Sequence, residues 1–257
     1  LTGSLSVKIK KPGEFGFRDF KTLEKRRFFC SEERRLNARF AARIYLDVVP
    51  IGGTREHPLV EAKGAAIEYA VKLRQFPQEA LGDRVLARGE LTLLHMDALA
   101  ELLAGFHARA GTAAGGDPFG SPEAIQSSVV QNFSQILDLS ISAAQLSIVN
   151  DTQTWARNRH ASLCKVFARR KREGRVRECH GDLHLGNIVI LDGAPLPFDC
   201  IEFNPDLRWI DVMNEVAFMV MDLRAADRAD LANRFLNAYL ESCGDYDGLR
   251  VLDYYVA

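Results

Sequence analysis

Four polar residues spaced along the segment 178–200 could carry out chemistry together. His180 and Asp182 are followed by Asn187, and a second acid, Asp199, comes after an Asp-Gly pair. Two carboxylates and a carboxamide oxygen suit a hard cation such as Mg²⁺, which shares its coordination shell with water and with substrate phosphates. The residue types and their order therefore predict a magnesium site that works on a phosphorylated compound.

A β-hairpin is the element that must position these residues. The Asp-Gly pair at positions 192 and 193 separates two short apolar runs, which is among the strongest local hairpin signals. In a hairpin folded at this pair, Asn187 and Asp199 lie about equally far from the turn, so their side chains converge at its open end. Asp182 then occupies the loop that leads into the first strand. Prolines in the second run indicate an edge strand or an irregular pair.

The segment 180–187, HGDLHLGN, matches the full HGDxHxxN pattern and, with Asp199 downstream, resembles the aminoglycoside phosphotransferase family, the small-molecule branch of the kinase-like fold. The stretches VKIKKP, FCSEERRLN, IYLDVVPI and DCIEFNPDLRWIDVMNEVAFMVMDL resemble one bacterial branch, in which this domain is often fused to a P-loop kinase or ATPase domain. Protein kinases use the same order of His, Asp, Asn and a metal-holding Asp. A protein kinase is disfavoured here, because Gly181 replaces the kinase arginine and Cys200 replaces the Phe of Asp-Phe-Gly.

The resemblance implies an α+β, bilobal, protein-kinase-like fold. A small antiparallel β-rich N-lobe that covers the nucleotide is expected over residues 1–71, and a larger helical C-lobe with the catalytic-loop hairpin over residues 72–257. The pattern along the chain agrees, since segments 44–51 and 59–73 are β-rich and helical patterns dominate after residue 77. The chain starts with Leu rather than Met, which predicts that the N-lobe is truncated at its start.

The resemblance also implies a division of roles in phosphoryl transfer. Asp182 is expected to act as the base that accepts or orients the proton of the attacking hydroxyl. Asn187 and Asp199 are expected to hold Mg²⁺ on the phosphates of ATP or GTP. His180 is expected to support the loop by packing or hydrogen bonding, and His184 to lie behind the catalytic residues.

Two lysines, Lys8 and Lys10, share one face of a predicted strand, because side chains alternate along a strand. Alignment with the family selects Lys8 as the cation that steadies the nucleotide phosphates, with Lys10 second; the alternative is that both are solvated lysines of an edge strand. A helical pattern over 23–42 places Glu33 on the inward face. An unpaired carboxylate there would cost several kcal/mol, so Lys8 is its expected partner, and Glu32 is the alternative to Glu33.

A hinge between the lobes binds adenine through backbone groups in kinase-like folds, and such groups leave little trace in side-chain identity. Order along the chain and the resemblance place this hinge at residues 67–72. Glu68, Tyr69 and Ala70 are therefore expected to contact the nucleotide.

The composition narrows the partners and the compartment. Thirty-three basic and 34 acidic residues give a formal net charge of -1, so neither a nucleic acid nor a membrane is expected as a partner. The five cysteines form no CxxC pair, and their odd number argues against a disulfide framework and favours the cytoplasm. No apolar run approaches the roughly 18 residues of a transmembrane helix. The basic run 169–172 is expected to be a solvated helix face.

The expected activity is transfer of the γ-phosphate of ATP or GTP, with Mg²⁺, to a hydroxyl of a small molecule. The alternative is a nucleotide-binding regulatory or adaptor domain with little turnover, working with a fused or partner P-loop ATPase domain. All of the expected catalytic and metal-binding residue types are present, and this favours activity. The lack of a visible glycine-rich phosphate cover keeps the alternative open.

Overall fold

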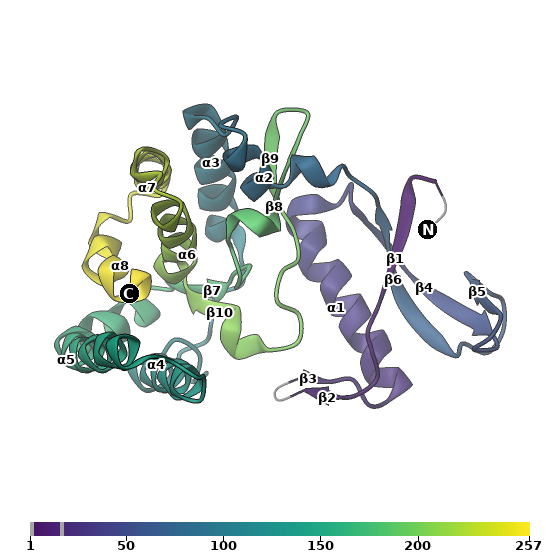
Figure 1. The fold of residues 1–257 in the computed structure, drawn as a ribbon, viewed down its shortest axis with the longest axis horizontal. Coiled ribbons are helices and arrows are strands. Elements are labelled where there is room, and N and C mark those ends of the chain that lie inside the picture. The colour runs from purple at the N-terminus through teal and green to yellow at the C-terminus, as the bar shows by residue number, and fades with distance from the viewer. Residues whose placement is uncertain (1–2, 16–17) are drawn as a thin grey trace. The chain divides into compact units, whose positions relative to one another are not determined.

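The computed structural model describes residues 3–15 and 18–257, and its contacts divide the chain into two compact units. The first unit comprises residues 1–99 and 180–208, and the second comprises residues 100–179 and 209–257. Figure 1 shows the elements along the chain. This division differs from the predicted lobes, whose boundary after residue 71 stays a prediction. All of the candidate site residues belong to the first unit.

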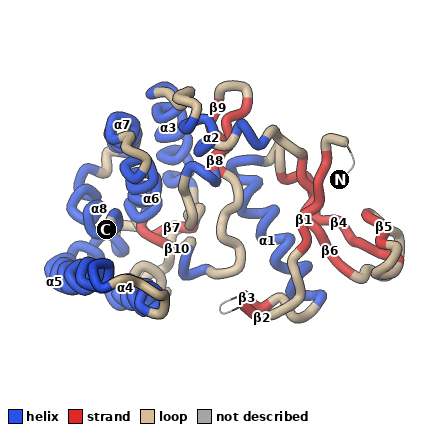
Figure 2. Tube along the Cα trace, viewed as in Figure 1, coloured by secondary structure: helices blue, strands red, loops and turns tan. Residues whose placement is uncertain are grey.

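An antiparallel sheet of four strands, in the order β1-β6-β4-β5, belongs to the first unit (Figure 2). Residue Lys8 lies opposite Val71 in the pairing of β1 with β6, so the predicted lysine-bearing strand is confirmed. A two-stranded hairpin of β2 and β3 follows β1 along the chain. The bounds are β1 (Leu5–Ile9), β2 (Glu14–Phe15), β3 (Arg18–Asp19), β4 (Tyr45–Gly53), β5 (Pro58–Val60) and β6 (Glu68–Arg74).

Helix α1 (Leu23–Ala41) packs against β4 and β6 and confirms the predicted helical pattern. Its first turn is capped by Thr22, whose hydroxyl accepts a hydrogen bond from the backbone N–H of Lys25 at 3.2 Å. The buried face of α1 carries two polar residues, Glu33 and Asn37, both 0% exposed. Because buried polar groups need partners, these two residues point to interactions with other elements.

The predicted hairpin is present, as β8 (Ile188–Leu191) paired with β9 (Ala194–Pro197). Asp192 and Gly193 both have positive φ, 53° and 75°, as a two-residue type I′ turn requires. A 3-10 turn, η2 (Leu185–Asn187), leads directly into the first strand. Three further short elements complete the first unit: η1 (Gln78–Ala80), α2 (Gly82–Ala87) and η3 (Pro205–Leu207).

The second unit is mainly helical. Helix α3 (Leu93–Arg109) begins in the first unit and ends in the second. The other elements are α4 (Pro122–Leu137), α5 (Ala143–Arg172), β7 (Val176–Glu178), β10 (Trp209–Asp211), α6 (Val212–Ala225), α7 (Ala229–Cys243), η4 (Tyr246–Gly248) and α8 (Leu249–Val256). Within residues 3–15 and 18–257, no helix combines the length and the apolar character needed to cross a membrane.

The prediction of a solvated basic run at 169–172 is wrong for Arg170, which is 1% exposed. Its guanidinium group donates hydrogen bonds of 2.7 to 2.9 Å to the carboxylates of Asp211 and Asp245. Asp211 also caps α6, because its carboxylate accepts a hydrogen bond from the backbone N–H of Met213 at 2.9 Å. The second unit therefore contains a buried arginine that two buried acids neutralise.

Candidate active site

At the open end of the hairpin, backbone pairing brings Asn187 close to the segment of Asp199. The N–H of Phe198 donates to the carbonyl of Asn187 at 2.9 Å, which continues the pairing beyond β8 and β9. Asp199 itself has a φ of 62°, in the left-handed region that few non-glycine residues occupy. Such a conformation costs about 1–3 kcal/mol and persists only where neighbouring contacts hold it.

Two side chains from other elements hold the backbone at Asp199. Its N–H donates to the hydroxyl of Tyr45, in β4, at 3.1 Å. The next N–H, of Cys200, donates to the buried Oδ1 of Asn37 at 2.9 Å. Burial and the negative charge of Asp199 raise the pKa of Tyr45, so its hydroxyl stays neutral. Helix α1 and the sheet thus fix the position of the predicted metal ligand.

Asp182 lies in the loop before η2 and has a partly exposed side chain. The amide nitrogen of Asn187 donates to the backbone carbonyl of Asp182 at 2.9 Å and to its Oδ2 at 3.1 Å. The Nε2 atom of His184 lies 3.6 Å from the same Oδ2. Hydrogen bonding and charge from His184 lower the pKa of Asp182, with Asn187 as a smaller cause. The carboxyl group is therefore ionised at neutral pH, as a base must be.

The ring of His184 is oriented by the loop that follows it. The N–H of Gly186 donates to Nδ1 at 3.1 Å, so the proton of the neutral ring is on Nε2, which faces Asp182. A Cβ atom at Gly186 would lie 2.8 Å from the His184 ring, which leaves room only for glycine. The glycine of this loop therefore permits the contact of His184 with the predicted base.

The hydrogen bonds of His180 agree with its expected role of supporting the loop. The side chain is fully buried, and its Nδ1 accepts a hydrogen bond from the N–H of Asp182 at 3.3 Å. Because Nδ1 accepts, Nε2 is the donor, and it lies 2.8 Å from the carbonyl of Phe198. His180 therefore links the loop of Asp182 to the residue that precedes Asp199.

The predicted ion pair between Lys8 and Glu33 is present. The Nζ atom of Lys8 lies 2.8 Å from Glu33 Oε1 and 2.5 Å from Asp199 Oδ1. Burial alone would lower the pKa of Lys8, but the charges of Glu33 and Asp199 outweigh it and raise the pKa. Lys8 is therefore charged and connects α1 to the predicted metal ligand.

Lys10 and Glu202 also belong to this cluster, and their pairing was not predicted from the sequence, which favoured a solvated surface acid at Glu202. Lys10, the second choice for the phosphate-binding lysine, is buried and pairs with both Glu33 and Glu202. The alternation along the strand could have indicated that Lys10 shares the environment of Lys8. Glu32, the alternative to Glu33, instead binds the guanidinium group of Arg35 at 2.8 Å.

Glu68, Tyr69 and Ala70, predicted as hinge residues, lie inside β6 and not in a connecting segment. Ala70 is fully buried and is paired with β1 on one side and with β4 on the other. This strand agrees with the predicted β-rich character of segment 59–73, and the expected contact of these three residues with the nucleotide stays a prediction. The chain leaves the sheet only after Arg74, at residues 75–77.

The residues present fit a hard cation. Asn187 uses its amide nitrogen for hydrogen bonds to Asp182, which leaves its amide oxygen as the atom for a metal ion. The side chain of Asp199 is 41% exposed and offers carboxylate oxygens. An amide oxygen and a carboxylate are the donors that Mg²⁺ takes from protein, while it keeps waters and phosphate oxygens in its other positions.

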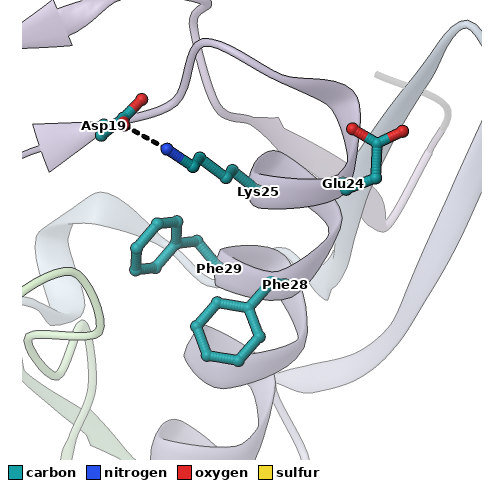
Figure 3. Close-up of a pocket in the computed structure, with 5 residues that line it drawn as sticks. All are labelled: Asp19, Glu24, Lys25, Phe28 and Phe29. Carbon is teal, nitrogen blue, oxygen red and sulfur yellow. Dashed lines mark hydrogen bonds and ion pairs between the residues drawn. The ribbon is translucent and has the colours of Figure 1, made fainter.

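One surface hollow lies elsewhere in the first unit (Figure 3). It is lined at the start of α1 by Asp19, Glu24, Lys25, Phe28 and Phe29, and the carboxylate of Asp19 binds Lys25 across it. None of the candidate residues lines this hollow.

Comparisons with known proteins identify the family. The model of the phosphotransferase enzyme family matches residues 54–252. Uncharacterized proteins of Mycobacterium bovis and of two strains of Mycobacterium tuberculosis are each 29% identical over 257 residues. These matches cover the whole chain, which spans only 50% of the length of each relative.

Solved structures share the fold. A glucosamine kinase in complex with glucosamine, ADP and inorganic phosphate has a TM-score of 0.52 and 21% identity, over 78% of this chain and 54% of that chain. Glucosamine kinase in crystal form B has a TM-score of 0.51 and 22% identity, over 74% of this chain and 55% of that chain. The predicted kinase-like fold is thus confirmed. Because the family model matches most of the chain, this protein belongs to the phosphotransferase enzyme family.

Proposed function

We propose that the chain transfers the γ-phosphate of ATP or GTP to a hydroxyl group of a small molecule, with Mg²⁺ as cofactor. The observation that carries the proposal is that Lys8 Nζ contacts both Glu33 and Asp199, at 2.8 and 2.5 Å. This contact joins the expected phosphate-binding cation to an expected metal ligand. His180 links the loop of Asp182 to the same segment.

The proposed roles follow from the charges. The acceptor hydroxyl gives its proton to Asp182 as its oxygen bonds to the γ-phosphorus, and the bond from that phosphorus to the β-phosphate oxygen breaks. Asn187 and Asp199 hold Mg²⁺, which neutralises the phosphates. Lys8, fixed by Glu33, steadies the phosphate oxygens. Phosphoryl transfer depends mainly on such positioning and neutralisation.

For the nucleotide base, we propose the connecting residues 75–77 in addition to the strand residues Glu68, Tyr69 and Ala70. The rings of Phe76 and Phe198 make an edge contact with centroids 5.3 Å apart. The connecting segment therefore lies beside the residue that precedes Asp199. A base bound along this segment has its phosphates within reach of the metal ligands.

For the acceptor, we propose a small hydroxylated molecule, and an amino sugar is the first compound to test. The basis is the shared fold with a glucosamine kinase, whose structure contains glucosamine and ADP. We place the reaction in the cytoplasm, because all five cysteines are free thiols.

A regulatory domain is the second candidate function. The chain spans only half the length of its mycobacterial relatives, so a further domain, such as a P-loop ATPase fused to it or bound as a partner, could use the nucleotide site for control. In that case the chain would bind magnesium nucleotide without transferring phosphate to any small molecule.

The test is a panel of sugars, amino sugars and aminoglycosides incubated with labelled ATP or GTP and Mg²⁺. Asp182→Ala is expected to lower transfer about 100-fold or more, the usual contribution of a general base, and to change nucleotide affinity only a few-fold. Asp138→Ala, an exposed aspartate that ends α4, is the control and should transfer normally. Undiminished transfer by Asp182→Ala would refute the mechanism, and binding without transfer across the panel would favour the regulatory function.

A further inference from the structure

Five charged side chains of the first unit form one continuous series of ion pairs, in the order Asp199, Lys8, Glu33, Lys10 and Glu202. The exposed pair, Lys8 and Asp199, has side chains that are 40% and 41% exposed. The buried pair, Lys10 and Glu202, has side chains that are each 7% exposed. Glu33 is 0% exposed and contacts both lysines. A ligand in solution can therefore reach only one end of the series.

Local structure places the buried pair beside the exposed pair and holds it there. Lys10 directly follows the end of β1, two positions after Lys8, and both lysines contact Glu33. Glu202 comes three residues after the predicted metal-binding aspartate. The ring of Phe20 lies 5.8 Å from Lys10 Nζ, and Arg208 donates a hydrogen bond to the carbonyl of Glu202 at 3.2 Å. Both members of the buried pair thus have further contacts.

Binding of magnesium nucleotide would change the partners of the exposed pair. Asp199 would turn to the cation and Lys8 to the phosphates, so the contact between them would be lost and the hold of Lys8 on Glu33 would weaken. A fully buried carboxylate that loses its cations is costly. Lys10 is the cation that remains at Glu33.

We infer that Lys10 is a positioning residue which, held by Glu202, keeps Glu33 in place while Lys8 turns from Asp199 to the phosphates and Asp199 turns to magnesium. The inference rests on the proposed function and adds a role for a buried pair that touches neither metal nor phosphate in that proposal. A positioning role requires that the effect of Lys10 on nucleotide binding depends on Glu33. A merely structural role would lower stability without this dependence.

The test is a double-mutant cycle in Mg²⁺–ATP affinity, measured by calorimetry on the full chain at a temperature where every variant is folded. Lys10→Met is expected to weaken binding about ten-fold, and in the Glu33→Gln background the same substitution is expected to change it less than about two-fold. Lys25→Met is the matched control. It breaks the ion pair with Asp19 at the start of α1, and neither residue belongs to the series or to the predicted nucleotide site.

An Mg²⁺–ATP affinity of Lys10→Met equal to that of the wild type would overturn the inference, and so would equal losses in both backgrounds. If Lys10→Met does not fold, Glu202→Gln, which keeps the side-chain size but removes the charge, replaces it in the cycle with the same expected dependence on Glu33. The two proposals fail in different ways. A wild-type chain that binds no Mg²⁺–ATP refutes the proposed function, whereas wild-type binding with an unaffected Lys10→Met refutes only the inference.

Discussion

Each compact unit contains a network of buried charges, and the two networks differ in whether a hydrogen-bonded ion pair is exposed to solvent. In the second unit, Arg170, Asp211 and Asp245 have side chains that are 1%, 3% and 2% exposed, and the more exposed Arg175 lies 3.8 Å from Asp245, beyond hydrogen-bonding distance. In the first unit, the series of ion pairs ends in Lys8 and Asp199, which are about two-fifths exposed. A ligand can compete for an exposed hydrogen-bonded pair only in the lysine network. The comparison therefore indicates structural support for the arginine network and agrees with the proposed ligand binding by the lysine network.

The largest expected effect tests the arginine network. Arg170→Met leaves the buried Asp211 without its cation and Asp245 with only Arg175, 3.8 Å away, and we expect a loss of about 3–5 kcal/mol in the free energy of unfolding, measured with urea. Arg169→Met is the matched control, since its half-exposed ion pair with Asp247 is worth about 1 kcal/mol or less. At a temperature where both variants are folded, Mg²⁺–ATP affinity should be unchanged. Weaker nucleotide binding without a loss of stability would contradict the assignment.

A smaller effect is expected from the exposed end of the lysine network. Asp199→Asn tolerates the positive φ but lacks the charge that attracts Mg²⁺. We expect Mg²⁺–ATP affinity to fall about 100-fold, or roughly 2.7 kcal/mol, and affinity for ATP with EDTA to change much less. Calorimetry with Mg²⁺ and with EDTA measures these two affinities separately. Equal losses under both conditions would show that Asp199 acts on the nucleotide without a metal.

The smallest effect concerns His184 and Asp182, whose side chains are 40% and 42% exposed. His184 lowers the pKa of Asp182. The ionised carboxylate therefore contributes stability above the ordinary carboxyl pKa of about 4, and this contribution is lost as the pH falls through the lowered value.

In His184→Gln the pKa of Asp182 should rise toward its ordinary value, so the free energy of unfolding should depend less on pH below about pH 5. The measurement is urea unfolding of both proteins across this range, and the acid side of the transfer rate should move to higher pH in the same variant. Parallel stability curves would show that His184 does not act on Asp182. His95→Gln, at the exposed start of α3, is the control and should leave both profiles unchanged.

Local patterns were sufficient to predict much of this site. The hairpin follows from an Asp-Gly pair that needs two positive φ angles. The contact of Lys8 with Glu33 was predicted from the helical period, which places Glu33 on an inward face, and from the family resemblance, which selected Lys8 over Lys10.

The parts that could not be predicted depend on distant partners. Arg170 is buried because its acids lie 41 and 75 residues away along the chain, and no local pattern distinguishes it from its solvated neighbours. Glu202 contacts Lys10 only because the loop that carries Glu202 lies beside the end of β1, and these two residues are 192 positions apart in the chain. The end of β6 at Arg74 could not be predicted locally, because the length of this strand depends on pairing with β1 and β4.

The type I′ turn at the tip of the hairpin has a consequence for how the protein can vary. Only the open end carries chemistry, so the strands β8 and β9 could lengthen or shorten by one residue each without separating Asn187 from Asp199. A single inserted residue in one strand would instead reverse which face its side chains occupy. Natural or engineered variants should therefore differ here by whole residue pairs. A label or a tag could be attached at the turn without displacing the site residues at the open end.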